Sequence, residues 1–293
     1  MIPRNWSDEY QLEIFRELYA KLHRQLEEED TSAHFIHIGD YEKEADEIIQ
    51  YGGRVRNIGT GYRGLDSLLC GFDKGELIVV SGSTATGKTL FVLNCLINAY
   101  LNFSGKFTSL IFSLEMTNPQ VTARIKQLLS ADLVAEEMKN LPIFMYSSRT
   151  SPSISKMRHV MTECQKNHGL DLVIIDHLHY FSRVVDNQAN EIGHLVREVK
   201  SLAMTFEVPI ILVAHTRKRG VGESIDKEPS FDDLRDSSFI AQDADVVVML
   251  KRDIMNPTLN SILNVFVAKN RNKGKVGTLV MNLEDYTYRL REE

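Results

Sequence analysis

One stretch of this sequence matches a phosphate-binding loop, Gly82-Ser83-Thr84-Ala85-Thr86-Gly87-Lys88-Thr89, which fits the pattern G-x-x-x-x-G-K-[ST]. A strand-like run at 76–81 leads into it and a helix-like run leads out. The glycines let backbone N–H groups approach an anion, and the helix directs the positive end of its dipole at that anion. We therefore predict that all eight residues bind nucleotide phosphates, with Lys88 on the β- and γ-phosphates and the Thr89 hydroxyl on Mg²⁺.

The composition is that of an ordinary globular protein. The chain has 293 residues, of which 43% are hydrophobic, so one large domain with an appendage can bury a sizeable core. The formal net charge of −6 excludes a protein-wide basic field. Any nucleic-acid site must therefore be a local basic patch.

The cysteines and the apolar runs bear on the cellular compartment. Cys70, Cys95 and Cys164 are far apart in sequence, which favours neither a disulfide framework nor a zinc pair. Neither a signal-peptide pattern nor an apolar run of ~18 residues is found. We expect a cytoplasmic protein, in a bacterial or phage-infected cell, that does not bind a membrane.

The N-terminal segment predicts an amphipathic helix. Apolar side chains recur at four-residue spacing over residues 6–29, and a charged connector follows at 39–50. Such a helix either covers the core of its own domain or docks on a neighbouring subunit. We predict an N-terminal linker and oligomerisation region at 1–50 and one catalytic domain at 51–293.

After a glycine-rich loop and short helix at 51–75, strand and helix patterns alternate. The strand-like runs are 76–81, 108–114, 172–176, 209–214, 245–250, 262–268 and 278–283, and the helical patterns are 88–102, 118–130, 153–167 and 189–206. This alternation predicts βαβ units and an α/β fold with a mainly parallel sheet. The last strands have no helices between them, which favours antiparallel pairing at one edge.

Acidic side chains follow two of these strands. Asp176 ends the apolar run at 172–176, where a carboxylate beside a P-loop holds Mg²⁺ through water, the Walker B role. Glu115 follows the run at 108–114, and open α/β sheets present ligands at the carboxyl ends of their strands. Glu115 is our candidate for the general base that activates water, with a helix-capping role as the alternative.

A histidine and a basic loop follow the strand at 209–214. His215 at this strand end is a candidate sensor of the γ-phosphate, with a purely structural role as the alternative. The next residues, 216–231, include Arg217, Lys218 and Arg219 among glycines. We predict that these three cations bind a phosphate backbone, unless the segment is only a solvated charge run.

A second basic turn at 269–274 follows the strand at 262–268. It contains Arg271, which the usual sheet order places too far from the P-loop of its own chain. We predict an arginine finger that reaches the γ-phosphate of a neighbouring subunit. The alternative is a basic turn with no catalytic role.

Taken in order, these motifs resemble the DnaB-type replicative helicases, which are hexameric motors with a RecA-like fold. The resemblance covers residues 58–290 and rests on GSTATGKT, FSLEM, LVIIDH, DLRDS, QDAD and KNRNKGKVG. It implies an ATP-dependent helicase that moves 5′→3′ on single-stranded DNA, with Mg²⁺ as cofactor. Histidine at 215 followed by Thr216-Arg217-Lys218 is similar to the phage primase-helicase and Twinkle branch.

The resemblance also implies roles for individual residues. Lys269 joins Arg271 in acting on the adjacent subunit, Arg252 stacks on the nucleotide base, and Arg235 joins the DNA-binding set. The helix at 6–29 corresponds to the linker helix that packs on the next subunit, whereas no zinc module, primase domain or N-terminal collar is found. A primase or loader is therefore a candidate partner in trans.

Two other classes of function fit parts of the sequence. A RecA/RadA- or KaiC-like ATPase binds DNA or protein without unwinding, but the DDLRDSSFIAQDADVV stretch matches the replicative helicases better. A nucleotide-switched scaffold or loader subunit needs no catalytic base. Glu115, Asp176 and Arg271 argue against that class.

Overall fold

The computed structural model divides the chain by residue contacts into two units, Met1–Gly52 and Gly53–Glu293. It describes residues 58–102, 107–129, 140–147, 152–177, 188–215, 242–256, 259–272 and 275–293, together with Ile38, Glu42, Lys43, Asp46 and Ile240. The predicted helix at 6–29 and the loop at 216–231 lie outside these residues. The predicted domain boundary after residue 50 stays a prediction.

The described part of the second unit is built on a nine-stranded sheet with the order β3-β2-β4-β5-β1-β6-β7-β8-β9. In this spatial order, the neighbours from β3 through β1 to β6 pair in parallel, and the neighbours from β6 through β8 to β9 pair antiparallel. This confirms the α/β fold and its antiparallel edge. The strands are β1 (Leu77–Gly82), β2 (Ser109–Ser113), β3 (Ile143–Met145), β4 (Leu172–Asp176), β5 (Ile210–His215), β6 (Val246–Lys251), β7 (Ile262–Asn270), β8 (Gly277–Leu283) and β9 (Leu290–Glu292).

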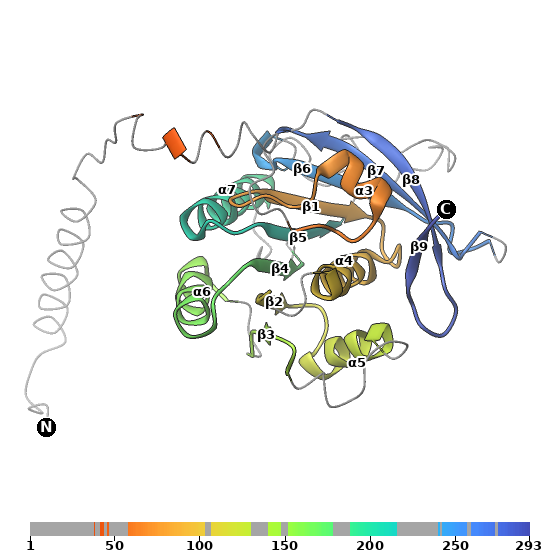
Figure 1. The fold of residues 1–293 in the computed structure, drawn as a ribbon, viewed down its shortest axis with the longest axis horizontal. Helices are drawn as coiled ribbons and strands as arrows, with labels where there is room; N and C mark the ends of the chain where they lie inside the picture. Colours follow the sequence, from red (N-terminus) through yellow and green to blue (C-terminus); the bar gives the residue numbers. More distant parts are fainter. Residues whose placement is uncertain are drawn as a thin grey trace, which may run out of the picture. The chain divides into compact units, whose positions relative to one another are not determined.

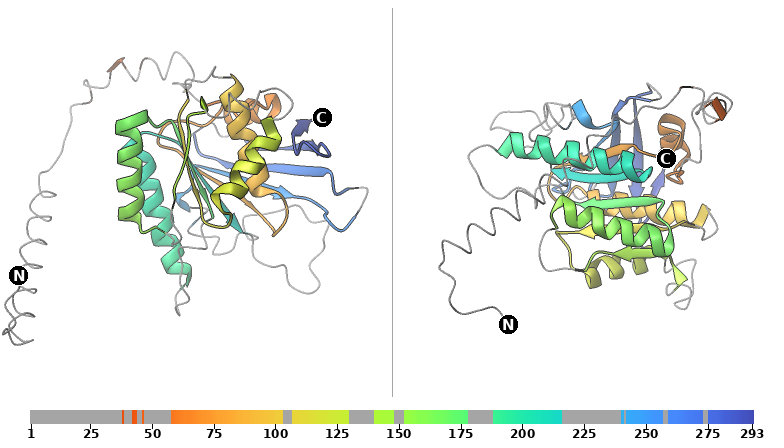
Figure 2. Two further views of the ribbon diagram at one scale, coloured as in Figure 1. Left: turned by 90° about the horizontal axis from the view of Figure 1, so that it is seen from below. Right: turned by 90° about the vertical axis from the view of Figure 1, so that its left-hand side faces the viewer.

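Helices cover both faces of this sheet (Figures 1 and 2). They are α3 (Arg63–Leu69), α4 (Lys88–Asn102), α5 (Asn118–Leu129), α6 (Ile154–His168) and α7 (Gln188–Phe206). Successive β1 side chains alternate between two cores: Ile78 and Val80 pack with α3, α4 and α5, whereas Leu77 and Val79 pack with α6 and α7. Each such buried aliphatic side chain contributes ~1.5–3 kcal/mol. Burial on both faces explains why the central strands are continuous apolar runs.

The sequence patterns did not predict two strands of this sheet. β3 and β9 have three residues each and lie at the two edges of the sheet. The sequence of β9, Leu-Arg-Glu, has one buried residue, and all three residues of β3 are half-buried. Neither segment is long enough to show periodicity. Cross-strand pairing, rather than local preference, makes each of them a strand.

The register of the parallel strands aligns their ends. We call the side of the sheet where these strands end the carboxyl edge, and the side where they begin the amino edge. At the carboxyl edge, Gly82 of β1 lies beside His215 of β5 and Leu250 of β6, and Ser113 of β2 lies beside Asp176 of β4. At the amino edge, β1 begins at Leu77. Gly82 lies five residue steps along β1 from Leu77, which corresponds to ~17 Å.

Candidate active site

The P-loop joins β1 to α4, as the sequence predicts. Gly87 has a φ of 103° and Ala85 a φ of 64°, so the loop turns through the left-handed region twice. Gly82 is required for a different reason from the one that the motif suggests. A Cβ on Gly82 would lie 2.9 Å from the carbonyl oxygen of Leu250, so the residue lets β6 pass close to the loop.

The Lys88 ammonium is enclosed by this loop. Its Nζ donates to the carbonyl oxygens of Gly82, at 3.0 Å, and Ser83, at 2.8 Å. Burial lowers the pKa of Lys88 to about 8, although the negative charges of Glu115 and Asp176 oppose the shift. An anion in the loop stabilises the charged form of a cation desolvated in this way, which suits Lys88 to bind phosphate.

Asp176 and Thr89 meet beside the loop in a geometry that fits Mg²⁺. The Thr89 hydroxyl donates to Oδ2 of Asp176 at 2.7 Å. The other carboxylate oxygen, Oδ1, is buried and has no hydrogen-bond partner among the described residues. A metal-bound water supplies a donor for such an orphaned acceptor. Burial, together with the nearby charge of Glu115, raises the pKa of Asp176 to about 6.

Glu115 lies beside two histidines at the carboxyl edge. Its Oε2 is 3.9 Å from Nε2 of His177, and the His177 ring meets the His215 ring edge-on at 4.1 Å between centroids. One donor atom from each of the three side chains lies within 4.8 Å of the others. The Glu115 side chain is 42% exposed, so water reaches it, whereas His177 is buried. These positions allow a carboxylate to take a proton from water next to the P-loop.

His177 was missed in the sequence analysis. It directly follows Asp176, and its place immediately after an apolar strand was the available signal. Burial lowers the pKa of His177, which favours the neutral imidazole, while Glu115 acts in the opposite direction.

Arg252 lies at the same edge, after β6. A Cβ built on Gly87 would be 3.9 Å from its Nη1, which places the guanidinium next to the P-loop. Its Nε donates to the carbonyl oxygen of Asn260.

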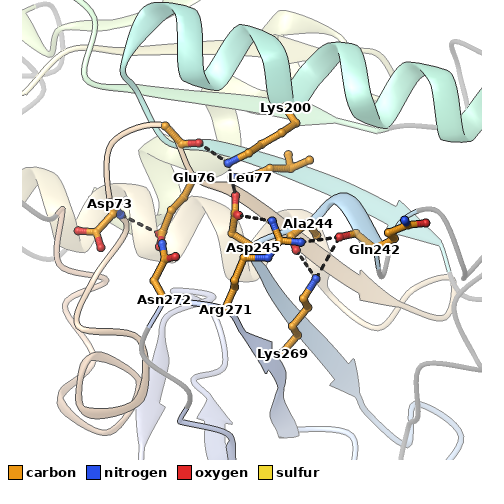
Figure 3. A network of polar contacts seen from close by, with 11 residues as sticks. Asp73, Glu76, Leu77, Lys200, Gln242, Ala244, Asp245, Lys269, Arg271 and Asn272 are labelled. Carbon is orange, nitrogen blue, oxygen red and sulfur yellow. Dashed lines mark hydrogen bonds and ion pairs between the residues drawn. The ribbon is translucent and has the colours of Figure 1, made fainter. Parts of the chain in front are cut away.

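Lys269 and Arg271 lie at the amino edge instead. β7 runs antiparallel to β6, so its last residues lie opposite the first residues of β6. The Arg271 guanidinium contacts Asp245, whose backbone pairs with Leu77 (Figure 3). The predicted finger and the P-loop of the same chain are therefore at opposite ends of β1. The proposed DNA-binding residues Arg217, Lys218, Arg219 and Arg235 lie outside the described residues.

The amino-acid sequence over residues 57–292 matches the family described as DnaB-like helicase C terminal domain. The chain belongs to this family. The DnaB-like domain is 33% identical over 251 residues to replicative DNA helicase DnaC of Bacillus subtilis (strain 168), and 32% identical over 251 residues to replicative DNA helicase DnaB of Geobacillus stearothermophilus. Each alignment covers 78% of this chain and 54% of the relative, so the chain spans about half the length of both.

Solved structures agree on the fold. One, entitled "The Structure Of A DnaB-Like Replicative Helicase And Its Interactions With Primase", has a TM-score of 0.70 at 22% identity and covers 92% of this chain and 70% of that chain. Another, described as an ATPase domain, has a TM-score of 0.73 at 23% identity and covers 88% of this chain and 99% of that chain. The DnaB-like domain has the RecA-like fold. None of its described helices is long and apolar enough to span a bilayer.

Asp176→Asn is expected to stabilise the nucleotide-free protein while it removes activity. The raised pKa means that ionised Asp176 opposes folding above about pH 6, by up to about 3 kcal/mol, and that this cost fades as the pH falls toward the unfolded value of 3.8. Urea unfolding of both proteins at about pH 8 and about pH 5 measures the difference, which should be larger at the higher pH. Equal differences at the two pH values would contradict it.

Proposed function

We propose that this DnaB-like domain hydrolyses ATP with Mg²⁺ and, as a hexameric ring, uses the energy to move 5′→3′ along single-stranded DNA and unwind duplexes. One observation supports this most. Lys88, Asp176 and Glu115 meet at the carboxyl edge, whereas Arg271 lies at the amino edge. A site that needs a further cation from outside its own chain fits a ring of identical subunits.

The described residues divide the chemistry among them. Glu115 accepts a proton from the attacking water, Lys88 binds the transferred phosphoryl oxygens, and His215 responds to the γ-phosphate. The Thr89 hydroxyl and, through a water, the Asp176 carboxylate would hold Mg²⁺, which would neutralise charge on the phosphates when bound. Arg252, next to Gly87, contacts the nucleotide base.

The nucleic-acid part of the proposal depends on the sequence and on the relatives. Arg217, Lys218, Arg219 and Arg235 are the proposed contacts to the DNA phosphates. The relatives are named replicative DNA helicases, and one structural neighbour is described with its primase interactions. We infer a primase or loader as a partner of this chain, and the cytoplasm as its place of action.

A strand-displacement assay tests the proposal. Forked DNA with a 5′ or a 3′ single-stranded tail is incubated with the protein, ATP and Mg²⁺. We expect unwinding that depends on the 5′ tail, and Lys88→Ala is the inactive control. The variant with Arg217, Lys218 and Arg219 changed to alanine should unwind poorly, and its DNA affinity should depend less steeply on salt.

The outcomes separate the alternatives. ATP hydrolysis that DNA stimulates, without unwinding, would favour the RecA/RadA- or KaiC-like function. Nucleotide binding without hydrolysis would favour the scaffold or loader subunit.

A further inference from the structure

Asp245 is the centre of a polar network at the amino edge (Figure 3). Its side chain is 5% exposed, and its Oδ2 accepts from the backbone N–H of Leu77 at 2.8 Å and from Nζ of Lys200 at 2.6 Å. Its Oδ1 accepts from Nη1 of Arg271 at 3.2 Å. One buried carboxylate therefore connects the first residue of β1, helix α7 and the proposed arginine finger.

The backbone at Asp245 makes the same connection. Its N–H donates to the carbonyl oxygen of Leu77 at 2.9 Å, and its carbonyl oxygen accepts from the N–H of Arg271 at 2.8 Å. The side chain of Asn272 donates to Glu76 at 2.6 Å, so the residue after the finger is also tied to the start of β1. The turn that carries Arg271 is thus held by both its backbone and its side chains.

The guanidinium of Arg271 is fixed in direction but still accessible. Its Nη2 donates to the carbonyl oxygen of Gln242 at 2.7 Å, and its side chain is 50% exposed. A planar guanidinium held at two points by Asp245 and Gln242 has few rotamers left to lose. A catalytic cation that is already oriented loses less entropy when it meets a phosphate.

An irregularity in β7 places Lys269 in the same network. Val247 of β6 lies opposite Lys269, and Val248 lies opposite Val267, so Ala268 is an extra residue in a β-bulge. The Lys269 ammonium donates to the carbonyl oxygens of Ala244, at 2.6 Å, and Gln242, at 3.3 Å. Bulges re-aim the side chains that follow them, and both basic side chains after this bulge donate to the carbonyl oxygen of Gln242.

We propose that Asp245 is the positioning residue of Arg271, and that it couples the P-loop strand β1 of one subunit to the cation that acts on the nucleotide of the next. The inference rests on the proposed action of Arg271 in trans. A displacement of β1 moves Leu77, and Asp245 transmits that movement to the guanidinium. A merely structural ion pair would stabilise the domain but would not set the turnover rate of the neighbouring site.

Asp245→Asn is the test, because asparagine keeps the size of the side chain and one acceptor oxygen but removes the charge. We expect kcat for ATP to fall by ~10²-fold, as for a misplaced catalytic group, with KM for ATP and affinity for fluorescent ADP unchanged. Asp171→Asn is the control, since the Asp171 carboxylate also accepts from a backbone N–H, that of Thr108 at 2.8 Å, and makes no ion pair with Arg271 among the described residues. Its kcat should match the parent value.

Mixing with Lys88→Ala subunits tests whether Asp245 acts on the neighbouring nucleotide, through Arg271, or only within its own subunit. An Asp245→Asn subunit has an intact P-loop, and a Lys88→Ala neighbour presents a well-placed finger, so mixed rings should regain ATPase activity. Mixtures of Asp245→Asn with Arg271→Ala should not regain it, because every finger is then defective. If Asp245→Asn folds poorly, the double variant Asp245→Asn/Lys200→Met takes its place in the same mixtures. The Lys200→Met change removes the ammonium that Asp245→Asn leaves uncompensated.

The outcomes are distinct. Parent-like kcat for Asp245→Asn overturns the inference. If Arg271→Ala mixed with Lys88→Ala regains activity but Asp245→Asn mixed with Lys88→Ala does not, Asp245 acts only within its own subunit, and the inference fails while the proposed function stands. If neither mixture regains activity although the subunits co-assemble, action in trans is wrong and the inference fails with it.

Discussion

Changing Arg271 to alanine is expected to lower ATP turnover by ~10³–10⁵-fold while nucleotide still binds, because an arginine finger stabilises charge on the phosphoryl group mainly in the transition state. Two features of the structure support this expectation. The guanidinium is half exposed and oriented by Asp245, and it lies at the opposite end of β1 from its own P-loop. Steady-state ATP hydrolysis and equilibrium binding of fluorescent ADP give the two quantities.

Mixing experiments test whether Arg271 acts on the nucleotide of the neighbouring subunit or on that of its own subunit. Arg271→Ala and Lys88→Ala subunits should each be inactive alone, but a mixed assembly of the proposed ring would contain interfaces with an intact P-loop and an intact finger. ATPase activity should therefore reappear in the mixture. If co-assembly is shown by an independent method and activity stays absent, Arg271 has no role on the neighbouring nucleotide.

Changing Glu115 to glutamine is expected to lower kcat by ~10²-fold or more, because an amide of the same shape cannot accept the proton of the attacking water. ATP binding should persist, since Lys88 and the loop are untouched. A control, Glu163→Gln, removes an exposed carboxylate from α6 without touching the site. Single-turnover hydrolysis measures the chemical step, and an unchanged rate for Glu115→Gln would exclude Glu115 as the base.

Several features could be predicted because they depend on residues close together in sequence. The P-loop is a local structure, in which glycines, a lysine and a helix N-terminus act within eight residues. The central strands are continuous apolar runs, since both faces of the sheet are covered. Placing Asp176 and His215 at strand ends needed only the strand boundaries. β4 ends at Asp176 as predicted, and β5 ends at His215, one residue beyond the predicted run.

Other features depend on contacts between distant parts of the chain. His177 joins Glu115 and His215 only because β2, β4 and β5 are neighbours in the sheet. The short strands β3 and β9 form by pairing at the sheet edges, where local sequence carries little signal.

The amino edge shows most clearly which features local sequence predicts and which depend on tertiary contacts. The sequence alone predicted that a basic turn with Arg271 follows a strand, and the usual sheet order added the prediction that this turn lies away from its own P-loop. Only the tertiary structure decided that Asp245, with Lys200 and the N–H of Leu77, holds this arginine. Lys200 and Asp245 are 45 residues apart, and Leu77 and Asp245 are 168 apart. Strand order and register bring them together, and both are set by packing of the whole core rather than by local preference.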